Sequence, residues 1–438
     1  MAPPRKVGWL ALPLVLVAVA AAAALALAEL HFRSKVRFEG STWPGAWDPR
    51  LGFTFKPGAT VRQTNGVDFW AESRVNRWGF VDREPLGAKT STSCRVAILG
   101  SSFVEAVQVE LGERLQVVFE ALARRTLPGR PIEAFALGYS GTGQVSQLPF
   151  YDALARTLEP DVVVLVLGPK DLANNSAVLT ALRNGWHPDH LPRHSLQRDA
   201  SGAFRWVAPD PDWRRYVLPQ PPTETRAEAR RSDAFLARSR LVSWTRAWLS
   251  VEHPTWFEPP AGPTSAETLA LRRAAIEGLP GYGRVFDGWR ALDDAEMDAV
   301  FATEGPLPAI FDEALAQTGA ALDLFVERAR RDRFTLLALT VDTVTSYRPT
   351  QLFGRKPTPD GVRGRVEALL AARSIPRIDQ ADYIASVHGR LEDAHFEHDG
   401  HWAPLGHRWA AEALASYFGA HPELCAARSS TAATGAIP

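Results

Sequence analysis

The sequence has little cysteine, little lysine and no excess of either charge. It contains two cysteines and six lysines among 438 residues, and 49 basic residues balance 49 acidic ones. Cys94 and Cys425 are too few for a disulfide framework, although they are compatible with an oxidising compartment, either as a pair or as two free thiols. Because a clustered basic excess is missing, we expect no nucleic-acid partner.

Several catalytic signatures are also missing from the sequence. No Gly-x-Ser-x-Gly elbow occurs, which disfavours the α/β-hydrolase fold. The segment "GTGQVS" (141–146) resembles a dinucleotide fingerprint, but it lacks the third glycine and follows the second predicted strand. No His-Glu-x-x-His helix occurs either. We therefore expect no cofactor and no metal, with zinc as a minor alternative because four histidines cluster near the C-terminus. These histidines are His395, His398, His401 and His407.

The N-terminus is a long apolar run. Residues 7–28, "VGWLALPLVLVAVAAAAALALA", carry no charge, and a helix of about 22 residues crosses a bilayer core of roughly 30 Å. The run is longer than the apolar region of a signal peptide, so it predicts a transmembrane signal-anchor within residues 1–30. The alternative is cleavage after Ala28, which would release a secreted protein. Both interpretations place the remaining chain outside the cytoplasm.

Beyond the anchor, the pattern predicts a β-rich extension over residues 31–94 and then alternating strands and helices. The first three strands start about 30–36 residues apart, which is the size of βαβ crossovers. The predicted strands are 95–100, 131–138, 161–168, 333–341 and 375–379, and the predicted helices are 113–125, 144–158, 310–331, 363–373 and 404–418. The fold class is therefore α/β, a three-layer αβα domain with a central parallel sheet.

Two segments depart from this alternation. Residues 176–305 are rich in proline and hold seven of the 14 tryptophans, so they predict an insertion or cap that is partly helical around 224–250. The tryptophans are expected to anchor this cap, with a sugar-binding cleft as the alternative. The main domain is then residues 95–420, and residues 421–438 have the composition of a disordered tail.

Small polar residues follow three of the predicted strands, where ligands bind in an open parallel sheet. Ser102 follows the first strand, Gly141 the second and Lys170 the third. Taken alone, Ser102 is better explained as a turn residue that caps the following helix, since serine is a preferred N-cap. As a nucleophile it would need a base, which His401 offers, with Asp399 two residues earlier to orient the imidazole.

Five blocks in this order resemble the SGNH or GDSL-like hydrolase superfamily. The likeness is strongest to its membrane-anchored bacterial members related to polysaccharide O-acetyltransferases and acetylesterases. The blocks are "NRWGF" (76–80), "LGSSFVEAVQV" (99–109), "ALGYSGTGQVSQ" (136–147), "LVLGPKDLANN" (165–175) and "DGHWAPLGHRWAAEAL" (399–414). The resemblance implies a flavodoxin-like SGNH fold and acyl transfer at an ester. It makes Ser102 the nucleophile, Asp399 and His401 the acid and base, and the amides of Ser102 and Gly141 the oxyanion hole.

The sequence departs from the family pattern at two positions. Ser101 stands where the family has aspartate, and Lys170 stands where it has the asparagine that donates to the oxyanion. A lysine donates with a different geometry, so Asn174 is an alternative donor.

The resemblance implies an esterase or O-acyl(acetyl)transferase at the periplasmic side of a bacterial inner membrane. It would act on an acylated glycan or small ester, with envelope proteins as further partners. The two departures motivate a second hypothesis, in which the protein is a catalytically inactive envelope scaffold or glycan-binding protein.

Overall fold

The computed structural model describes residues 11–85, 87–127, 129–184, 192–212, 239–253, 298–341 and 357–426. Most of the predicted cap therefore lies outside the described residues, as do residues 427–438 of the predicted tail. Of the seven tryptophans in the predicted cap, the structure describes Trp206, Trp244 and Trp248.

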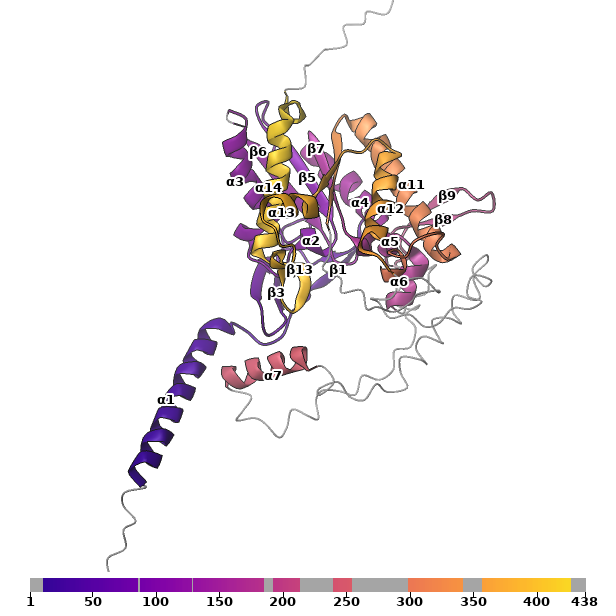
Figure 1. Cartoon of the computed structure of the whole chain (residues 1–438). Helices are drawn as coiled ribbons and strands as arrows, with labels where there is room; N and C mark the ends of the chain where they lie inside the picture. The colour runs from indigo at the N-terminus through magenta and orange to yellow at the C-terminus, as the bar shows by residue number, and fades with distance from the viewer. Residues whose placement is uncertain are drawn as a thin grey trace, which may run out of the picture.

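Helix α1 (Ala11–Lys35) projects away from the body of the protein (Figure 1). The most apolar 18-residue window of its stretch Pro13–Lys35 has a mean hydropathy of 2.3 and is not buried against the rest of the chain. By length and composition this helix suits a membrane anchor or a signal sequence.

The segment between α1 and the main sheet forms two antiparallel pairs of strands. They are β1 (Gly45–Asp48) with β2 (Gly52–Phe55), and β3 (Thr60–Thr64) with β4 (Trp70–Arg74). Phe55, Val75 and Phe80 from this segment are buried in the same hydrophobic core as one face of the main sheet. The extension is therefore packed onto the α/β body.

Five parallel strands form the main sheet in the order β11-β10-β7-β5-β6. The strands are β5 (Cys94–Gly100), β6 (Ile132–Gly138), β7 (Val162–Leu167), β10 (Thr335–Thr340) and β11 (Arg377–Asp379). β6 follows β5 in the chain and lies on one side of it. The next strand, β7, lies on the other side of β5, and β10 and β11 follow on that side. The strand order therefore reverses between β5 and β7, and ligands of open α/β sheets bind at this switch point.

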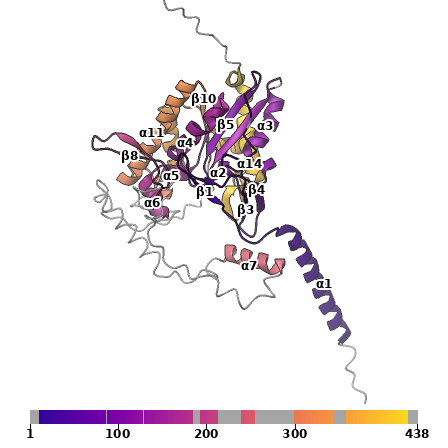
Figure 2. The same cartoon turned by 180° about the vertical axis from the view of Figure 1, so that it is seen from behind.

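Helices cover both faces of the sheet (Figures 1 and 2). Alternate residues of β5 face opposite sides of the sheet. Val96 and Ile98 are buried in the hydrophobic core on one face, and Ala97 and Leu99 are buried in the core on the other face. The first face carries α3 (Leu115–Thr126) and α14 (Pro404–Ala420), and the second carries α4 (Gln144–Ala153), α11 (Ala309–Asp332) and α12 (Pro359–Ala371). This arrangement confirms the predicted three-layer α/β class.

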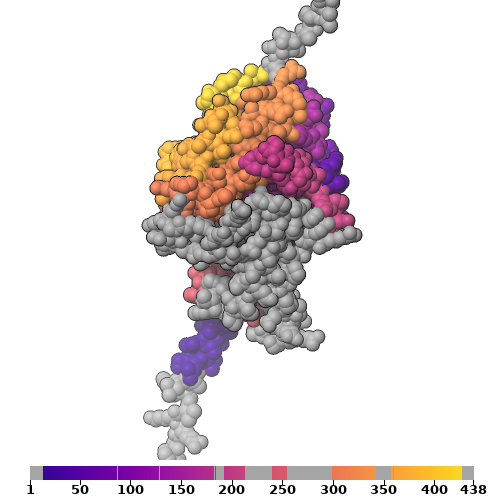
Figure 3. All heavy atoms as spheres, turned by 90° about the vertical axis from the view of Figure 1, so that its right-hand side faces the viewer, coloured from indigo at the N-terminus to yellow at the C-terminus, as the bar shows by residue number. Residues whose placement is uncertain are grey.

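Shorter elements surround this framework. They are α2 (Ser102–Glu105), α5 (Pro169–Asn174), α6 (Ala177–Asn184), α7 (Arg240–Glu252), α13 (Gln380–Val387), β8 (Ser195–Arg198), β9 (Phe204–Val207), β12 (His395–Phe396), β13 (Asp399–Trp402) and the 3-10 helices η1 (Leu111–Glu113), η2 (Ala155–Leu158), η6 (Glu392–Ala394) and η7 (Pro422–Cys425). The β8–β9 hairpin lies against α11 (Figure 3), where Arg198 pairs with Glu313 and the Leu196 carbonyl accepts a hydrogen bond from Gln317.

The C-terminal end differs from the prediction of a disordered tail beginning at residue 421. Pro422–Cys425 forms η7, and Cys425 is bonded to Cys94 at the start of β5. Both cysteines are buried, and the disulfide fixes η7 to the first residue of β5. The pairing that the sequence left open is therefore present.

Candidate active site

Ser102 lies two residues after Gly100, the last residue of the buried strand β5. It is the first residue of the one-turn helix α2 and is half-buried at the carboxyl edge of the sheet. Ser101 occupies the N-cap position, so the alternative reading of Ser102 as the helix cap is wrong. Gly138 at the end of β6 permits this close packing, because a Cβ there would lie 2.1 Å from the Glu105 amide nitrogen of α2.

Asp399 and His401 lie together on the hairpin formed by β12 and β13. The His401 Nδ1 atom is 2.5 Å from Asp399 Oδ1, and the His401 amide N–H donates to the same oxygen over 2.9 Å. Burial opposes ionisation of Asp399, but the hydrogen bonds and charge of His401, with the charge of Lys170, hold its pKa below the ordinary value. An ionised carboxylate at Nδ1 fixes the tautomer of His401 and leaves Nε2 for proton transfer.

The hairpin contacts α2 through Phe103, the residue after Ser102. The Phe103 ring centroid is 5.6 Å from that of His401 and 4.9 Å from that of Trp402. These contacts bring the base to the same sheet edge as the serine. In the described chain no hydrogen bond joins Ser102 Oγ to His401. Such bonds are often long in enzymes without substrate and shorten in the complex.

Gly141 lies in the turn after β6, at the same edge of the sheet as Ser102. Gly100 of β5 pairs with Gly138 of β6, so the turns after these two strands start at the same level. Gly141 has a φ of +68°, in the left-handed region that favours glycine. Among the residues that the structure describes, neither the Ser102 nor the Gly141 amide N–H donates to another protein group. Two free amides at one edge are what an oxyanion hole requires.

Two charged side chains hold the turn at Ser140 and Gly141. Glu105 accepts hydrogen bonds from the Ser140 amide, over 3.1 Å, and from the Ser140 hydroxyl. Arg193 donates to the Gly141 carbonyl and, over 3.0 Å, to the Ser140 carbonyl. The Ser140 carbonyl and the Gly141 N–H belong to one planar trans peptide and point in opposite directions. By fixing that carbonyl, Arg193 also fixes the direction of the candidate oxyanion donor.

Burial perturbs both of these charged groups. Glu105 is 1% exposed, and its burial raises its pKa to about 7 against the opposing effect of the bonds from Ser140. Burial also lowers the pKa of Arg193, which the charges of Tyr139 and Glu105 partly offset. A carboxyl group whose pKa lies close to neutrality therefore sits directly beneath the turn that carries Gly141.

Lys170 is exposed in the first turn of α5, after strand β7. Its ammonium is close enough to Asp399 to lower the pKa of that carboxyl. In the described part of the chain Lys170 makes no hydrogen bond or ion pair, so it is free to turn toward the site. Asn174, the alternative donor, ends α5 and its Oδ1 accepts from Arg183 Nη1 over 3.0 Å. That contact directs Asn174 toward α6.

Asp171 connects the strand ends behind the site. This carboxylate accepts from the Gly168 amide over 3.0 Å and from the Gln144 side chain over 3.3 Å. Its burial raises its pKa to about 7. Ser101, which departs from the family pattern, lies close enough to Asp171 to oppose this rise in its pKa.

The other C-terminal histidines have separate partners. His407 is buried against Trp402, and burial lowers its pKa to about 3. His395 Nδ1 contacts the Leu391 carbonyl, and His398 contacts residues outside this segment. Over the described residues, no three His, Cys, Asp or Glu side chains converge as metal ligands.

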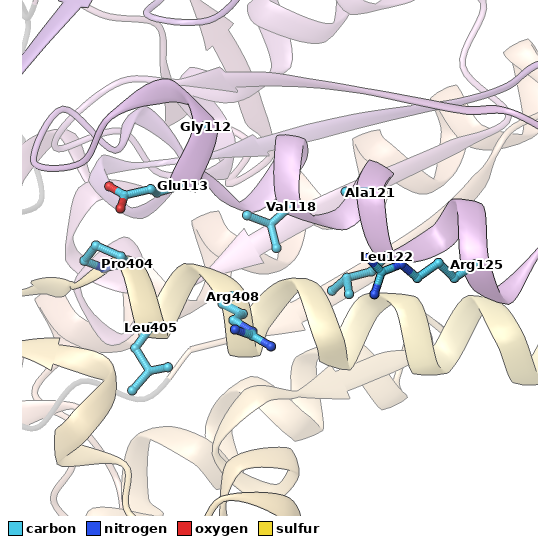
Figure 4. Close-up of a pocket in the computed structure, with 9 residues that line it drawn as sticks. All are labelled: Gly112, Glu113, Val118, Ala121, Leu122, Arg125, Pro404, Leu405 and Arg408. Carbon is cyan, nitrogen blue, oxygen red and sulfur yellow. The ribbon is translucent and has the colours of Figure 1, made fainter.

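A separate groove of about 560 Å³ lies between α3 and α14 (Figure 4). It is lined by Gly112, Glu113, Val118, Ala121, Leu122, Arg125, Pro404, Leu405 and Arg408. None of these is a candidate site residue, so the groove is distinct from the site at the sheet edge.

The sequence predicted the candidate catalytic and oxyanion residues of the site, but it did not predict the buried charged residues that support them. Ser102, Gly141, Lys170, Asp399 and His401 all lie at the carboxyl edge or on the hairpin that contacts it. Glu105, Asp171 and Arg193 were not assigned. The role of Asp171 could have been predicted from the sequence. Gly168 and Pro169 indicate the N-cap and first residue of a helix, and an acidic residue at the third helical position typically accepts a hydrogen bond from the N-cap amide.

Comparisons with known proteins found solved structures of low similarity to this chain. No family model and no curated protein matches the chain. Solved structures that resemble it include an acetylxylan esterase from Geobacillus stearothermophilus, at 10% identity over 75% of this chain and 97% of that chain, with a TM-score of 0.35. Another is an acetyl xylan esterase, AlAXEase, at 11% identity over 74% and 98%, with a TM-score of 0.33.

A third neighbour is described as a lipolytic protein of the G-D-S-L family, from Desulfitobacterium hafniense. It is 9% identical over 74% of this chain and 98% of that chain, with a TM-score of 0.33. These neighbours are GDSL lipolytic proteins and acetylxylan esterases. With TM-scores below 0.5 they carry no argument about activity, which has to rest on the residues of this chain.

Proposed function

We propose that this protein is a membrane-anchored serine esterase or O-acyltransferase of the SGNH type. The observation that carries the proposal is the Asp399–His401 pair, which is hydrogen-bonded and contacts the helix that starts at Ser102. The pair and the serine lie at the carboxyl edge of the sheet, next to the switch point between β5 and β7. The proposed substrate is an acylated glycan of the cell envelope or a smaller ester.

In the proposed reaction, Ser102 Oγ attacks the ester carbonyl while His401 Nε2 accepts its proton. The tetrahedral intermediate collapses when His401 returns that proton to the leaving alcohol. Asp399 remains ionised and stabilises the imidazolium. Water or a glycan hydroxyl then attacks the acyl-enzyme by the same route, which gives hydrolysis or acyl transfer and regenerates Ser102.

The oxyanion of the intermediate is assigned to the amides of Ser102 and Gly141 and to the ammonium of Lys170. Removal of one such donor costs about 10²–10³ in kcat in enzymes of this chemistry. Lys170 contributes a full charge where an asparagine would contribute a dipole, so it compensates for less exact geometry by stronger attraction.

Two observations support a location outside the cytoplasm. Cys94 and Cys425 are disulfide-bonded, and such bonds persist in oxidising compartments. Helix α1 is apolar enough to span a membrane, which suits an anchor in a bacterial inner membrane with the body in the periplasm. Envelope proteins are then the natural further partners.

The test is hydrolysis of p-nitrophenyl acetate by the purified full chain in detergent micelles, with Ser102→Ala as the comparison. The proposal expects turnover that this substitution abolishes, and a covalent adduct on Ser102 with a serine-directed phosphonate. Equal turnover in the Ser102→Ala variant would sink the assignment.

A second candidate is a non-catalytic glycan-binding or scaffold protein. Lys170 in the place of the oxyanion asparagine favours it, as does the missing hydrogen bond between Ser102 and His401. Saturable binding of acetylated glycan without phosphonate labelling would select this candidate.

A further inference from the structure

His398 lies beside Asp399 but contacts two other parts of the chain. Its Nδ1 is 2.9 Å from Asp68 Oδ1 in the turn between β3 and β4, and its amide N–H donates to Asp68 Oδ2 over 3.0 Å. Its Nε2 is 3.1 Å from Glu252 Oε1 at the end of α7. A neutral imidazole has one N–H, so contacts to two carboxylates require the doubly protonated imidazolium.

The contact with Asp68 clamps the candidate catalytic hairpin onto the N-terminal extension. Asp68 is held in place by Asn65, which donates to it over 2.7 Å and accepts from its amide over 2.8 Å. The Phe69 and Phe396 rings lie 4.7 Å apart beside this contact. One side of the hairpin is therefore fixed by a rigid turn, whereas Glu252 forms the other side and is more exposed.

Helix α7 runs from this contact to the end of α1 (Figure 1). Glu29 of α1 accepts hydrogen bonds at the first turn of α7 from the Ser239 hydroxyl over 2.7 Å and from the Leu241 amide over 3.0 Å. The rings of Phe32 and Trp244 stack with centroids 4.6 Å apart. A chain of direct contacts therefore joins α1 to the hairpin that carries Asp399 and His401.

We propose that His398 is a positioning residue that locks this hairpin between Asp68 and Glu252 and thereby couples it to helix α1 through α7. The proposal rests on the proposed function, since its effect on turnover requires that Asp399 and His401 are the catalytic pair. His398 holds the hairpin so that His401 keeps its place against Phe103, the residue after Ser102.

The lock depends on pH because it requires the charged form of His398. The groups that face it are Asp68 from the β3–β4 turn, Glu252 from α7 and Glu397 from its own turn, and all three favour the charge. The bond to Asp68 raises the pKa of His398 most, and burial opposes it. When His398 loses a proton, the remaining N–H stays with the better-buried Asp68 and the contact with Glu252 is released.

The experiment measures kcat and KM for p-nitrophenyl acetate between pH 6 and pH 9 on the full chain in detergent micelles. Glu252→Gln removes the carboxylate of α7 that contacts His398. Glu397→Gln is the matched control, because it also removes one negative charge, from the residue next to His398 in the sequence. Since a neutral amide holds the imidazolium of His398 less tightly than a carboxylate does, we expect Glu252→Gln to lower kcat about tenfold at pH 6 with KM unchanged. The difference from the unaltered chain should vanish by pH 9, where the contact is already released.

His398→Asn keeps a donor for Asp68 but cannot reach Glu252. It should match Glu252→Gln at pH 6, and the double variant should show no further loss, as expected for residues that act through one contact. The proposal would be overturned if the loss of kcat in Glu252→Gln were constant over the pH range or if Glu397→Gln lost as much. It would also be overturned if the losses of Glu252→Gln and His398→Asn added in the double variant.

Hydrogen exchange at pH 6 gives a readout that does not depend on activity. Residues 395–402 should exchange faster in Glu252→Gln than in Glu397→Gln, and equal exchange in both would refute the lock. Failure of the proposed function shows separately, as turnover that survives Ser102→Ala or as absence of turnover in the unaltered chain.

Discussion

Replacement of Glu105 by glutamine tests how the buried carboxyl group beneath the Ser140–Gly141 turn behaves. Glutamine keeps an oxygen for the Ser140 amide and offers an N–H to the Ser140 hydroxyl, so the two contacts of Glu105 can persist. What the substitution removes is the cost of ionising a carboxyl group that is 1% exposed.

The magnitude follows from the pKa of Glu105, which burial raises from its ordinary 4.5 to about 7. Each pH unit between the two values is worth about 1.4 kcal/mol, so ionisation of the folded protein costs about 3 kcal/mol. Between these pH values the folded state binds a proton that the unfolded state has lost. The contribution of Glu105 to stability is therefore present below pH 4.5 and is lost as the pH rises through 7.

The assay is urea unfolding of the full chain in detergent micelles, followed by tryptophan fluorescence at pH 5 and pH 8. The free energy of unfolding of Glu105→Gln, relative to the unaltered chain, should increase by about 2–3 kcal/mol between these values. Asp171, whose burial also raises its pKa to about 7, is present in both proteins and cancels from the comparison. A difference that does not change with pH would show that Glu105 is not held in its neutral form.

Three further predictions concern the site and its framework. Asp399→Asn should lower kcat by about 10³–10⁴ with little change in KM, because His401 loses the carboxylate that fixes its tautomer; wild-type kcat in this variant would exclude a triad. Lys170→Ala should lower kcat by about 10²–10³, and Lys170→Asn should restore most of it, whereas equal rates in all three proteins would remove Lys170 from the oxyanion hole. Replacing Cys94 and Cys425 by serine should lower the free energy of unfolding by about 2–5 kcal/mol, and an unchanged urea midpoint would contradict a stabilising disulfide.

Much of the framework was predictable because the central strands are buried on both faces. A run such as 162–167 is entirely valine and leucine and is completely buried, so its pattern specifies a core strand without further context. Ser102, Asp399 and His401 were predictable for another reason, since each lies at a strand end or just before the last helix, where sequence position alone indicates the sheet edge.

The supporting charges could not be predicted from local pattern. Arg193 contacts Gly141 from 52 residues away, and His398 joins segments that are 330 and 146 residues distant in sequence. Whether a glutamate such as Glu105 is buried depends on which turn packs over it, and that is decided by the tertiary fold. The same holds for Glu252, whose helix lies within a segment that the sequence assigned only to a partly helical cap.

The most direct test of the account is phosphonate labelling of the full chain, with the labelled residue located by mass spectrometry and the rate of p-nitrophenyl acetate hydrolysis measured in parallel. The account predicts one adduct, on Ser102, that forms as turnover is lost and that fails to form in His401→Ala. Labelling of another residue, or full turnover after Ser102 is modified, would contradict it.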